Sequence, residues 1–342
     1  MKQIAVLGAG SFGTALAVHL ASMGANAGGN RVRLWARNPE LARQMAEERA
    51  NPEYLPDVEI PAGVEPTAEM EPLAECDIVL VVVPSHGFRG VLRQFLRAHP
   101  ADRPAVIVSA TKGIETDTLA RMSQVSFEEG TAAGREVRFA TLSGPTFAAE
   151  LARNSPSAAV VASEDAALAT EIRERLSTRL LRLYSSSDVV GVELGGTVKN
   201  VVAIAAGTVT GLGFGQNTLA ALITRGLHEI TRLGIAYGGQ PRTFAGLAAL
   251  GDLVLTCTGG LSRNRRTGLE LAAGKSLDEI TGETHMVAEG IRNSLAVSRL
   301  AAQKGVEMPI TQQMVAVLYE GKDPRLAVEQ LMTRELKAET EL

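Results

Sequence analysis

The stretch QIAVLGAGSFGTALAVHLASMG, residues 3–24, decides the fold class of the amino-terminal half of the chain. Its first five residues are a short apolar run, which leads through a glycine-rich turn into a helix-forming segment. A strand, a glycine turn and a helix in this order predict a dinucleotide-binding unit, since the amides and the dipole of the helix N-terminus face the pyrophosphate. A plain glycine turn is the alternative. We expect Gly8 to permit the tight turn, Gly10 to let the backbone approach the pyrophosphate, and Gly13 to allow close helix packing.

Two all-apolar runs, Ile78 to Val83 and Ala105 to Ala110, predict further strands of the same sheet. Runs without polar alternation are typical of parallel strands buried on both faces. Ligands bind at the carboxyl ends of such strands, where Ser85, His86 and Lys112 fall. We expect Lys112 to face a phosphate or the cofactor. His86 is as often a structural hydrogen-bonding residue as a catalyst at such a position.

The rest of the amino-terminal part continues the strand and helix pattern. Further strands are expected at 139–142, 158–162 and 180–183, with a helix at 165–176. After the first of these strands, Gly144 offers a backbone amide and Thr146 a hydroxyl at the mouth of the sheet. Residues 46–74 are rich in proline and glutamate, and we expect them to wrap the surface as loops and short helices.

The second strand, Arg31 to Ala36, bears on the choice between NAD and NADP. Sites specific for NAD usually place an acid after this strand, where the adenosine ribose lies. Here the strand is followed by Arg37 and Asn38. No carboxylate is available for the 2′-hydroxyl, and Arg37 could pair with a 2′-phosphate. We therefore expect NADP to be accepted and preferred over NAD, with a plain surface role for Arg37 as the alternative.

A second decisive stretch, GVELGGTVKNVVAIAAGTVTG, occupies residues 191–211. Lys199 is the only charged side chain between Glu193 and Arg225, and apolar residues recur around it at helical spacing. A helix that is apolar on most sides is predicted to run through the middle of a domain. Burial disfavours the charged form of an ammonium group unless a carboxylate or a ligand anion restores it. The alternative is a lysine that reaches water along its own stem.

Strand signals stop after Glu193, and the pattern becomes helical. We therefore predict a dinucleotide-binding domain at 1–190 and a helical substrate domain at 191–342. Within the second, the segment GGLSRNRR at 259–266 is a glycine-loosened turn that leads into a helix with three arginines and an amide. A phosphate would fit there, since guanidinium groups match its oxygens and the helix N-terminus adds amides. A solvated basic turn is the alternative.

Length and composition exclude several classes of protein. The 342 residues suffice for two domains, and 45% hydrophobic with 21% charged residues is typical of a soluble globular protein. A net charge of -4 argues against a general nucleic-acid binder. The longest aliphatic run is much shorter than the about 20 residues of a membrane span, and no signal peptide precedes the fold, so we expect a cytoplasmic protein. Cys76 and Cys257 form no disulfide framework and no metal site, and each is expected to be a small buried residue.

Seven blocks spread over the whole chain carry a resemblance to a known family. They are GAGSFGTALA (8–17), VPSH (83–86), KGIE (112–115), LSGPTFAAE (142–150), ELGGTVKN (193–200), LGDLVLTCTGGLSRNRRTG (250–268) and VAEG (287–290). Together they resemble the bacterial NAD(P)-dependent glycerol-3-phosphate dehydrogenase family. The glycine-rich turn alone would fit many dehydrogenases, whereas GGTVKN together with SRNRRTG would not.

The resemblance implies a Rossmann-like doubly wound sheet followed by an all-helical domain, and the reversible reduction of dihydroxyacetone phosphate to sn-glycerol 3-phosphate for phospholipid synthesis. It implies NADP or NAD as cofactor, Lys199 as general acid/base and Asp252 as the carboxylate that orients the ammonium. The residues that surround the substrate in this pattern are Lys112, Gly144, Thr146, Lys199, Asp252, Ser262, Arg263 and Asn264. Beside the glycines of the turn, the residues that contact the cofactor are Ser11, Phe12, Arg37, Lys112, Ala148, Arg263, Val287 and Glu289.

Two rival hypotheses remain at this stage. One is a dehydrogenase of similar plan for another small hydroxy acid, which the absence of the basic cluster at 263–266 would have favoured. The other is a non-catalytic dinucleotide sensor, which predicts loss of Lys199. Whether the protein forms a homodimer stays open.

Overall fold

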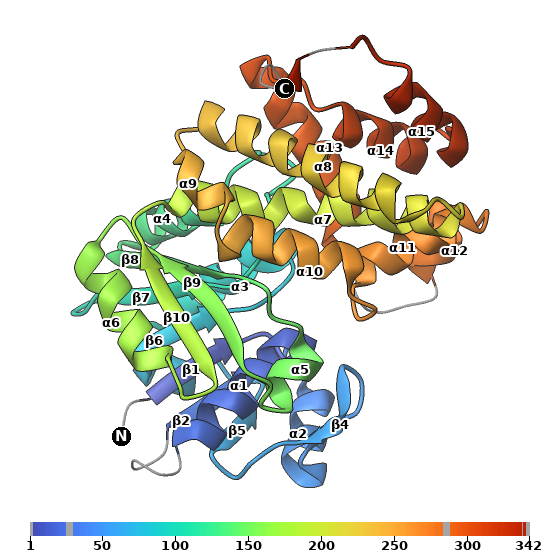
Figure 1. The fold of residues 1–342 in the computed structure, drawn as a ribbon. Coiled ribbons are helices and arrows are strands. Elements are labelled where there is room, and N and C mark those ends of the chain that lie inside the picture. Colours follow the sequence, from blue (N-terminus) through green and yellow to red (C-terminus); the bar gives the residue numbers. More distant parts are fainter. Residues whose placement is uncertain (1–2, 25–29, 283–287, 337, 340–342) are drawn as a thin grey trace. The chain divides into compact units, whose positions relative to one another are not determined.

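The computed structural model describes residues 3–24, 30–282, 288–336 and 338–339 (Figure 1). The chain forms two compact units, one made of 1–112 with 120–189 and the other of 113–119 with 190–342. The sequence pattern places the boundary between residues 190 and 191, and the structure divides the chain after Val189. The structure also assigns the short segment 113–119, which directly follows Lys112, to the second unit.

The first unit is built on an eight-stranded sheet with the order β10-β9-β8-β7-β6-β1-β2-β5. The strands are β1 (Gln3–Leu7), β2 (Arg31–Trp35), β5 (Val64–Thr67), β6 (Ile78–Val81), β7 (Ala105–Ser109), β8 (Val137–Ser143), β9 (Ser157–Ala162) and β10 (Leu181–Ser186). Neighbouring strands are parallel except β8 and β9, which run antiparallel. The apolar runs of β1, β6 and β7 lie in the middle of this sheet, as buried parallel strands require.

Helices pack against this sheet and close the core of the first unit. They are α1 (Ser11–Gly24), α2 (Pro39–Glu48), the short 3-10 helix η2 (Glu71–Glu75), α3 (Ser85–Ala98), α4 (Met122–Ala133), α5 (Ala148–Ala152) and α6 (Ala166–Leu176). Side chains of α1, α5 and α6, such as Leu16, Leu151 and Leu168, share one hydrophobic cluster with the strands. α3 packs against α4. The Rossmann-like fold class expected for the amino-terminal part is confirmed.

Residues 46–74 correct one expectation. Instead of loops and short helices alone, they contain the antiparallel pair β3 (Ala50–Asn51) and β4 (Leu55–Glu59), and β5 extends the main sheet beside β2. Pro66 lies within β5, and because a proline argues against a strand, the sequence did not predict this one. A proline is tolerated there because β5 is an edge strand, so one side of its backbone needs no partner strand.

Most of the described residues of the second unit lie in helices, which pack around α7 (Val189–Gly211) (Figure 1). The others are α8 (Gln216–Ala236), α9 (Pro241–Phe244), the π-helical turn η3 (Leu247–Gly251), α10 (Asp252–Thr258), α11 (Arg263–Ala272), α12 (Leu277–Gly282), α13 (Glu289–Lys304), α14 (Pro309–Tyr319) and α15 (Pro324–Met332). Within the described part of the chain, α7 is the one unbroken helix that is long and apolar enough to cross a membrane, yet 94% of its apolar window is buried inside the protein. It is the core helix that the sequence predicts.

Candidate active site

The glycine-rich turn between β1 and α1 has the geometry that its sequence predicts. Gly8 has a φ of +119°, and a side chain there would place its Cβ 2.5 Å from the carbonyl oxygen of Val82. A Cβ on Gly13 would lie 1.9 Å from the carbonyl oxygen of Gly8. Both positions therefore exclude any other residue. At Gly10, by contrast, no heavy atom lies within 4 Å of the Cβ position, so the backbone faces open space that a ligand could enter.

Asn51 holds this turn in place from the hairpin of β3 and β4. Its side-chain amide is fully buried and donates to the carbonyl oxygen of Ala9 and to Thr14 Oγ1, each at 2.8 Å. Its Oδ1 in turn accepts from the backbone amide of Tyr54. Asn51 was not predicted, since it is separated from the turn by about forty residues of sequence and lies in the segment expected to form loops and short helices.

Three predicted residues of the first unit meet beyond the carboxyl ends of β7 and β8. Lys112 Nζ donates to the carbonyl oxygen of Gly144 at 3.0 Å, and Thr146 Oγ1 donates to the same oxygen at 3.3 Å. Position 144 admits only glycine, because a Cβ there would lie 2.8 Å from the Cα of Ala159. Ala148, the first residue of α5, follows on the same loop.

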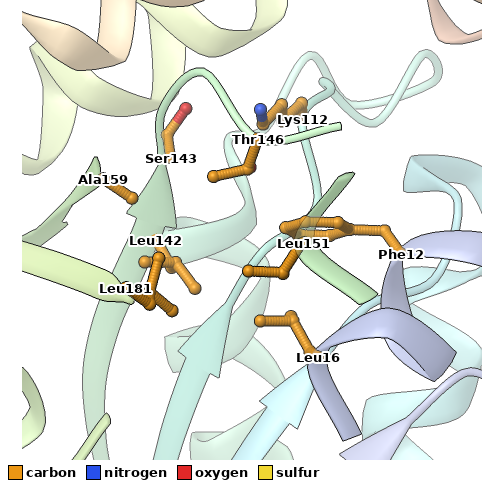
Figure 2. A pocket seen from close by; sticks show the side chains of 9 residues that line it. All are labelled: Phe12, Leu16, Lys112, Leu142, Ser143, Thr146, Leu151, Ala159 and Leu181. Atoms are coloured by element: carbon orange, nitrogen blue, oxygen red, sulfur yellow. The ribbon is translucent and has the colours of Figure 1, made fainter. Parts of the chain in front are cut away.

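A small pocket opens beside these residues (Figure 2). Its polar lining comes from Lys112, Ser143 and Thr146. The remaining lining is apolar and includes Phe12 and Leu16 of α1. Since Phe12 lies between Gly10 and Gly13 of the glycine-rich motif, this motif contributes one wall of the pocket.

Arg37 lies two residues after the end of β2, with an exposed side chain. Among the described residues, its guanidinium has no hydrogen bond or ion pair. The neighbouring Asn38, by contrast, uses its side chain to cap α2, where it accepts a hydrogen bond from the amide of Glu40. His86 is exposed near the start of α3. The guanidinium of Arg37 is thus available to an anion at the end of β2.

In the second unit, Lys199 is buried and paired. Its Nζ donates to Asp252 Oδ1 at 2.9 Å and to Thr256 Oγ1 at 2.6 Å, and the side chains of Lys199 and Asp252 are only 6% and 3% exposed. Thr256 donates to the backbone carbonyl of Asp252 one turn earlier. The ammonium therefore does not reach water along its stem. Thr256 was not predicted, although its i+4 spacing from Asp252 on α10 places both on one helix face.

A chain of buried amides lies next to Lys199 along α7. Asn264 Nδ2 donates to Asn200 Oδ1 at 2.9 Å, and Asn264 Oδ1 accepts from the amide of Gly290 at 2.9 Å. These bonds tie the starts of α11 and α13 to α7. Gly290 permits this approach, because a Cβ there would lie 2.5 Å from the carbonyl oxygen of Asn200.

The starts of α11 and α13 carry the remaining predicted residues. Ser262 caps α11 by accepting from the amide of Arg265, and Arg263 is exposed at the first helical position. Glu289 is the half-buried first residue of α13. Val287, predicted to contact the cofactor, lies outside the described residues.

The two cysteines are free and buried, as predicted. Burial raises the pKa of Cys257 to about 12, so its thiol is inert although it lies on α10 beside Thr256. No group of His, Cys, Asp or Glu side chains suited to a metal ion occurs among the residues that the structure describes.

Comparisons with known proteins decide the family. A family model described as "NAD-dependent glycerol-3-phosphate dehydrogenase N-terminus" matches residues 3–169, and its C-terminal counterpart matches residues 188–329. The chain belongs to the NAD-dependent glycerol-3-phosphate dehydrogenase family. The family resemblance carried by the seven sequence blocks is thereby confirmed.

Relatives and solved structures of this family cover almost the whole chain. A glycerol-3-phosphate dehydrogenase [NAD(P)+] of Geobacter sp. (strain M21) is 51% identical over 99% of both chains. The one of Koribacter versatilis is 50% identical over 98% of both. The crystal structure of glycerol-3-phosphate dehydrogenase from Coxiella burnetii matches with a TM-score of 0.90 at 40% identity, covering 97% of this chain and 99% of that one.

Proposed function

We propose that the protein catalyses the reversible NAD(P)H-dependent reduction of dihydroxyacetone phosphate to sn-glycerol 3-phosphate, in the cytoplasm and for glycerophospholipid synthesis. The observation that carries this proposal is the buried ammonium of Lys199, held by Asp252 and Thr256 in a chain of this family. The relatives named glycerol-3-phosphate dehydrogenase, at about half identity over the full chain, support the same reaction.

Lys199 is proposed as the general acid/base. When bound, the nicotinamide supplies a hydride to the C2 carbonyl carbon in one direction and accepts it in the other. The carbonyl oxygen gains negative charge as the hydride arrives, and Lys199 Nζ donates the proton that makes it a hydroxyl. In the reverse direction, the neutral amine takes this proton back.

Asp252 and Thr256 are proposed to aim the lysine. Nζ can make three hydrogen bonds, and two of them are occupied by Asp252 Oδ1 and Thr256 Oγ1. Two fixed partners leave few rotamers for the long side chain, so its proton is held in one direction. Such positioning lowers the barrier because its entropic cost is met before the substrate binds.

The start of α11 is proposed to hold the phosphate of the substrate. Arg263 presents an exposed guanidinium at the first helical position, and the dipole of this ten-residue helix places partial positive charge at its N-terminus. Asn264 and Ser262 are buried and hydrogen-bonded next to it. In the first unit, Lys112, Gly144 and Thr146 are proposed to contact the substrate.

Residues 1–190, which contain the whole first unit, are proposed as the dinucleotide-binding domain, and residues 191–342 as the substrate domain. Support for the first comes from the open face of Gly10 and from the N-terminus of α1 that follows it, where the helix dipole suits a pyrophosphate. Arg37 is proposed to favour NADP through its 2′-phosphate. The other proposed cofactor contacts are Gly8, Ser11, Phe12, Gly13, Lys112, Ala148, Arg263, Val287 and Glu289.

One assay tests the reaction. Nicotinamide absorbance is followed with dihydroxyacetone phosphate, using NADH and NADPH in turn, and unphosphorylated dihydroxyacetone as the control substrate. We expect oxidation of the cofactor that depends on the phosphorylated substrate. The absence of such oxidation with both cofactors would overturn the proposed function, and comparable kcat/KM for the two substrates would remove the phosphate site at α11.

A further inference from the structure

Segment 113–119 begins directly after Lys112 and belongs to the second unit, although the chain before and after it belongs to the first. Two of its side chains fix it there by packing. Ile114 is fully buried within the hydrophobic cluster of the second unit, and Leu119 packs against the same cluster. The chain therefore leaves the first unit at Lys112 for a short excursion that is held at both of its ends.

The backbone of Leu119 shows that this excursion is held against a local preference. Its φ of +60° lies in the left-handed region, which a bulky residue rarely adopts. Such a residue costs about 1–2 kcal/mol and persists only where the surrounding structure fixes it. The amide of Leu119 donates to the carbonyl oxygen of Glu115 at 2.8 Å, which closes the segment into a turn. A strained residue of this kind supports a hypothesis of function for the segment that contains it.

Helix α13 holds the segment with two polar side chains. Asn293 is fully buried, and its Oδ1 accepts a hydrogen bond from the backbone amide of Ile114 at 3.3 Å. Arg299, exposed on the same helix, donates to the carbonyl oxygen of Thr116 at 3.4 Å. A buried amide oxygen needs such a donor, because leaving it unpaired costs about 1–3 kcal/mol. Asn293 thus satisfies its own oxygen and fixes the backbone two residues after Lys112.

The start of the same helix is tied to the residues around Lys199. The amide of Gly290 donates to Asn264 Oδ1, and Asn264 in turn donates to Asn200, the neighbour of Lys199. Asn293 follows Gly290 by three residues on α13, and is therefore about one helical turn away. One helix thus carries both the contact to the network beside the buried lysine and the anchor of this segment.

The chain is also fixed on the other side of Lys112. The hydroxyl of Thr111 donates to the carbonyl oxygen of Val83 at 2.7 Å, directly before the lysine. Only Lys112 and Gly113 separate this fixed point from the amide that Asn293 holds. A side chain whose backbone is held on both sides loses less freedom when it binds a ligand, and this favours affinity.

We propose that Asn293 is a positioning residue for Lys112, which it places for the phosphorylated substrate through the backbone of residues 113 and 114. The inference rests on the proposed function, in which Lys112 contacts dihydroxyacetone phosphate. Without Asn293, the ammonium group of Lys112 keeps its charge but samples more positions, so part of the binding energy of the substrate is used to order it. Lys199 keeps its own partners on α10, so the proton transfer itself is not affected.

A cycle of Asn293→Leu, Lys112→Ala and the double variant tests the proposal. Leucine roughly keeps the volume of asparagine and removes the acceptor oxygen. The KM for dihydroxyacetone phosphate is measured on the full chain with saturating cofactor. We expect Asn293→Leu to raise this KM about three- to tenfold, the range of one hydrogen bond, with kcat changed less than about twofold. In the Lys112→Ala background the same substitution should change KM less than about twofold, because the residue through which it acts is already absent.

Two control variants separate positioning from stability. Ser294→Ala removes a fully buried hydroxyl from the same helix, but one that donates to the carbonyl oxygen of Ile291 within α13. We expect its Tm to fall and its KM to stay that of the parent protein. Asn293→Asp keeps an oxygen that can accept from the amide of Ile114 in either protonation state, so its KM should stay within about twofold of the parent even where its Tm falls. Since KM does not depend on how much of the protein is folded, lower stability alone does not raise it.

Three results would overturn the inference. One is an unchanged KM in Asn293→Leu, and another is a rise in KM of the same size with and without Lys112. The third is a rise in Ser294→Ala as large as that in Asn293→Leu, which would show a general effect of damage to α13.

A further variant decides the question if Asn293→Leu does not fold. Arg299→Ala removes the exposed contact with Thr116, and we expect it to raise KM about two- to threefold, near the lower limit for a hydrogen bond, and only while Lys112 is present. An unchanged KM would then overturn the inference. Failure of the proposed function is distinguishable from these results, because the parent protein itself would show no turnover of dihydroxyacetone phosphate.

Discussion

The ion pair between Lys199 and Asp252 makes a quantitative prediction about stability. The perturbation is a cycle of Lys199→Met, Asp252→Leu and the double variant. Each replacement roughly keeps the volume and removes the charge. Because both side chains are almost fully buried at 2.9 Å separation, each single variant leaves one charge buried without its counter-ion.

The magnitude follows from this burial. Removing one partner of a buried pair costs about 3–5 kcal/mol, whereas replacing both by apolar side chains is often neutral. In Asp252→Leu, Thr256 still accepts a hydrogen bond from Lys199 Nζ, and in Lys199→Met it can donate one to Asp252. The stability loss of each single variant should therefore lie near the lower limit of this range. We expect each single variant to lose about 3 kcal/mol and the double variant to lose less than about 1 kcal/mol.

Urea unfolding followed by circular dichroism measures these free energies. The coupling energy is the stability lost by the double variant minus the summed stability lost by the two single variants. Its size should reach several kcal/mol, in favour of the intact ion pair. Single losses that are small and simply add in the double variant would refute the reasoning, since the two charges would then be solvated independently.

Three further predictions concern pH, cofactor and substrate. Burial raises the pKa of Glu229, which accepts from the amides at the start of α14, from 4.5 to about 7. The folded state thus keeps a proton that the unfolded chain releases, so this carboxyl's contribution falls by about 2–3 kcal/mol between about pH 5 and pH 8, and urea unfolding of Glu229→Gln should lack this slope. Arg37→Ala should raise the KM for NADPH and leave that for NADH; equal effects would contradict a 2′-phosphate contact. Arg263→Ala should mainly raise the KM for dihydroxyacetone phosphate, and an unchanged KM would move the phosphate elsewhere.

Local signals made much of the fold predictable from the sequence. The glycine-rich turn is readable because two of its demands are local: Gly8 takes a positive φ, and Gly13 packs against the backbone of Gly8. The central strands are readable because burial on both faces removes polar alternation. β5 could not be predicted in this way. Pro66 is tolerated because β5 lies at the edge of the sheet, and the position of a strand in the sheet depends on all the other strands.

Contacts between distant parts of the chain could not be predicted. Asn51 supports the turn through Ala9, and Asn293 accepts from the amide of Ile114, which ties the segment 113–119 to α13 within the second unit. Nothing local distinguishes either asparagine from a surface residue.

The candidate site was predicted unevenly. The isolated charge of Lys199 in an apolar helix indicated burial from the sequence alone. Its pairing with Asp252 came from the family resemblance, and the geometry now gives it a physical reason. Thr256 could have been found from its spacing on α10, whereas the contacts of Arg37 and Arg263 with ligands stay predictions.

The most direct test of the central claim is the turnover of Lys199→Ala with dihydroxyacetone phosphate, measured beside the Kd of its cofactor. If Lys199 is the general acid/base, kcat falls by about 10²–10⁴ while the cofactor binds as tightly as in the parent protein. Turnover near that of the parent protein would contradict the account.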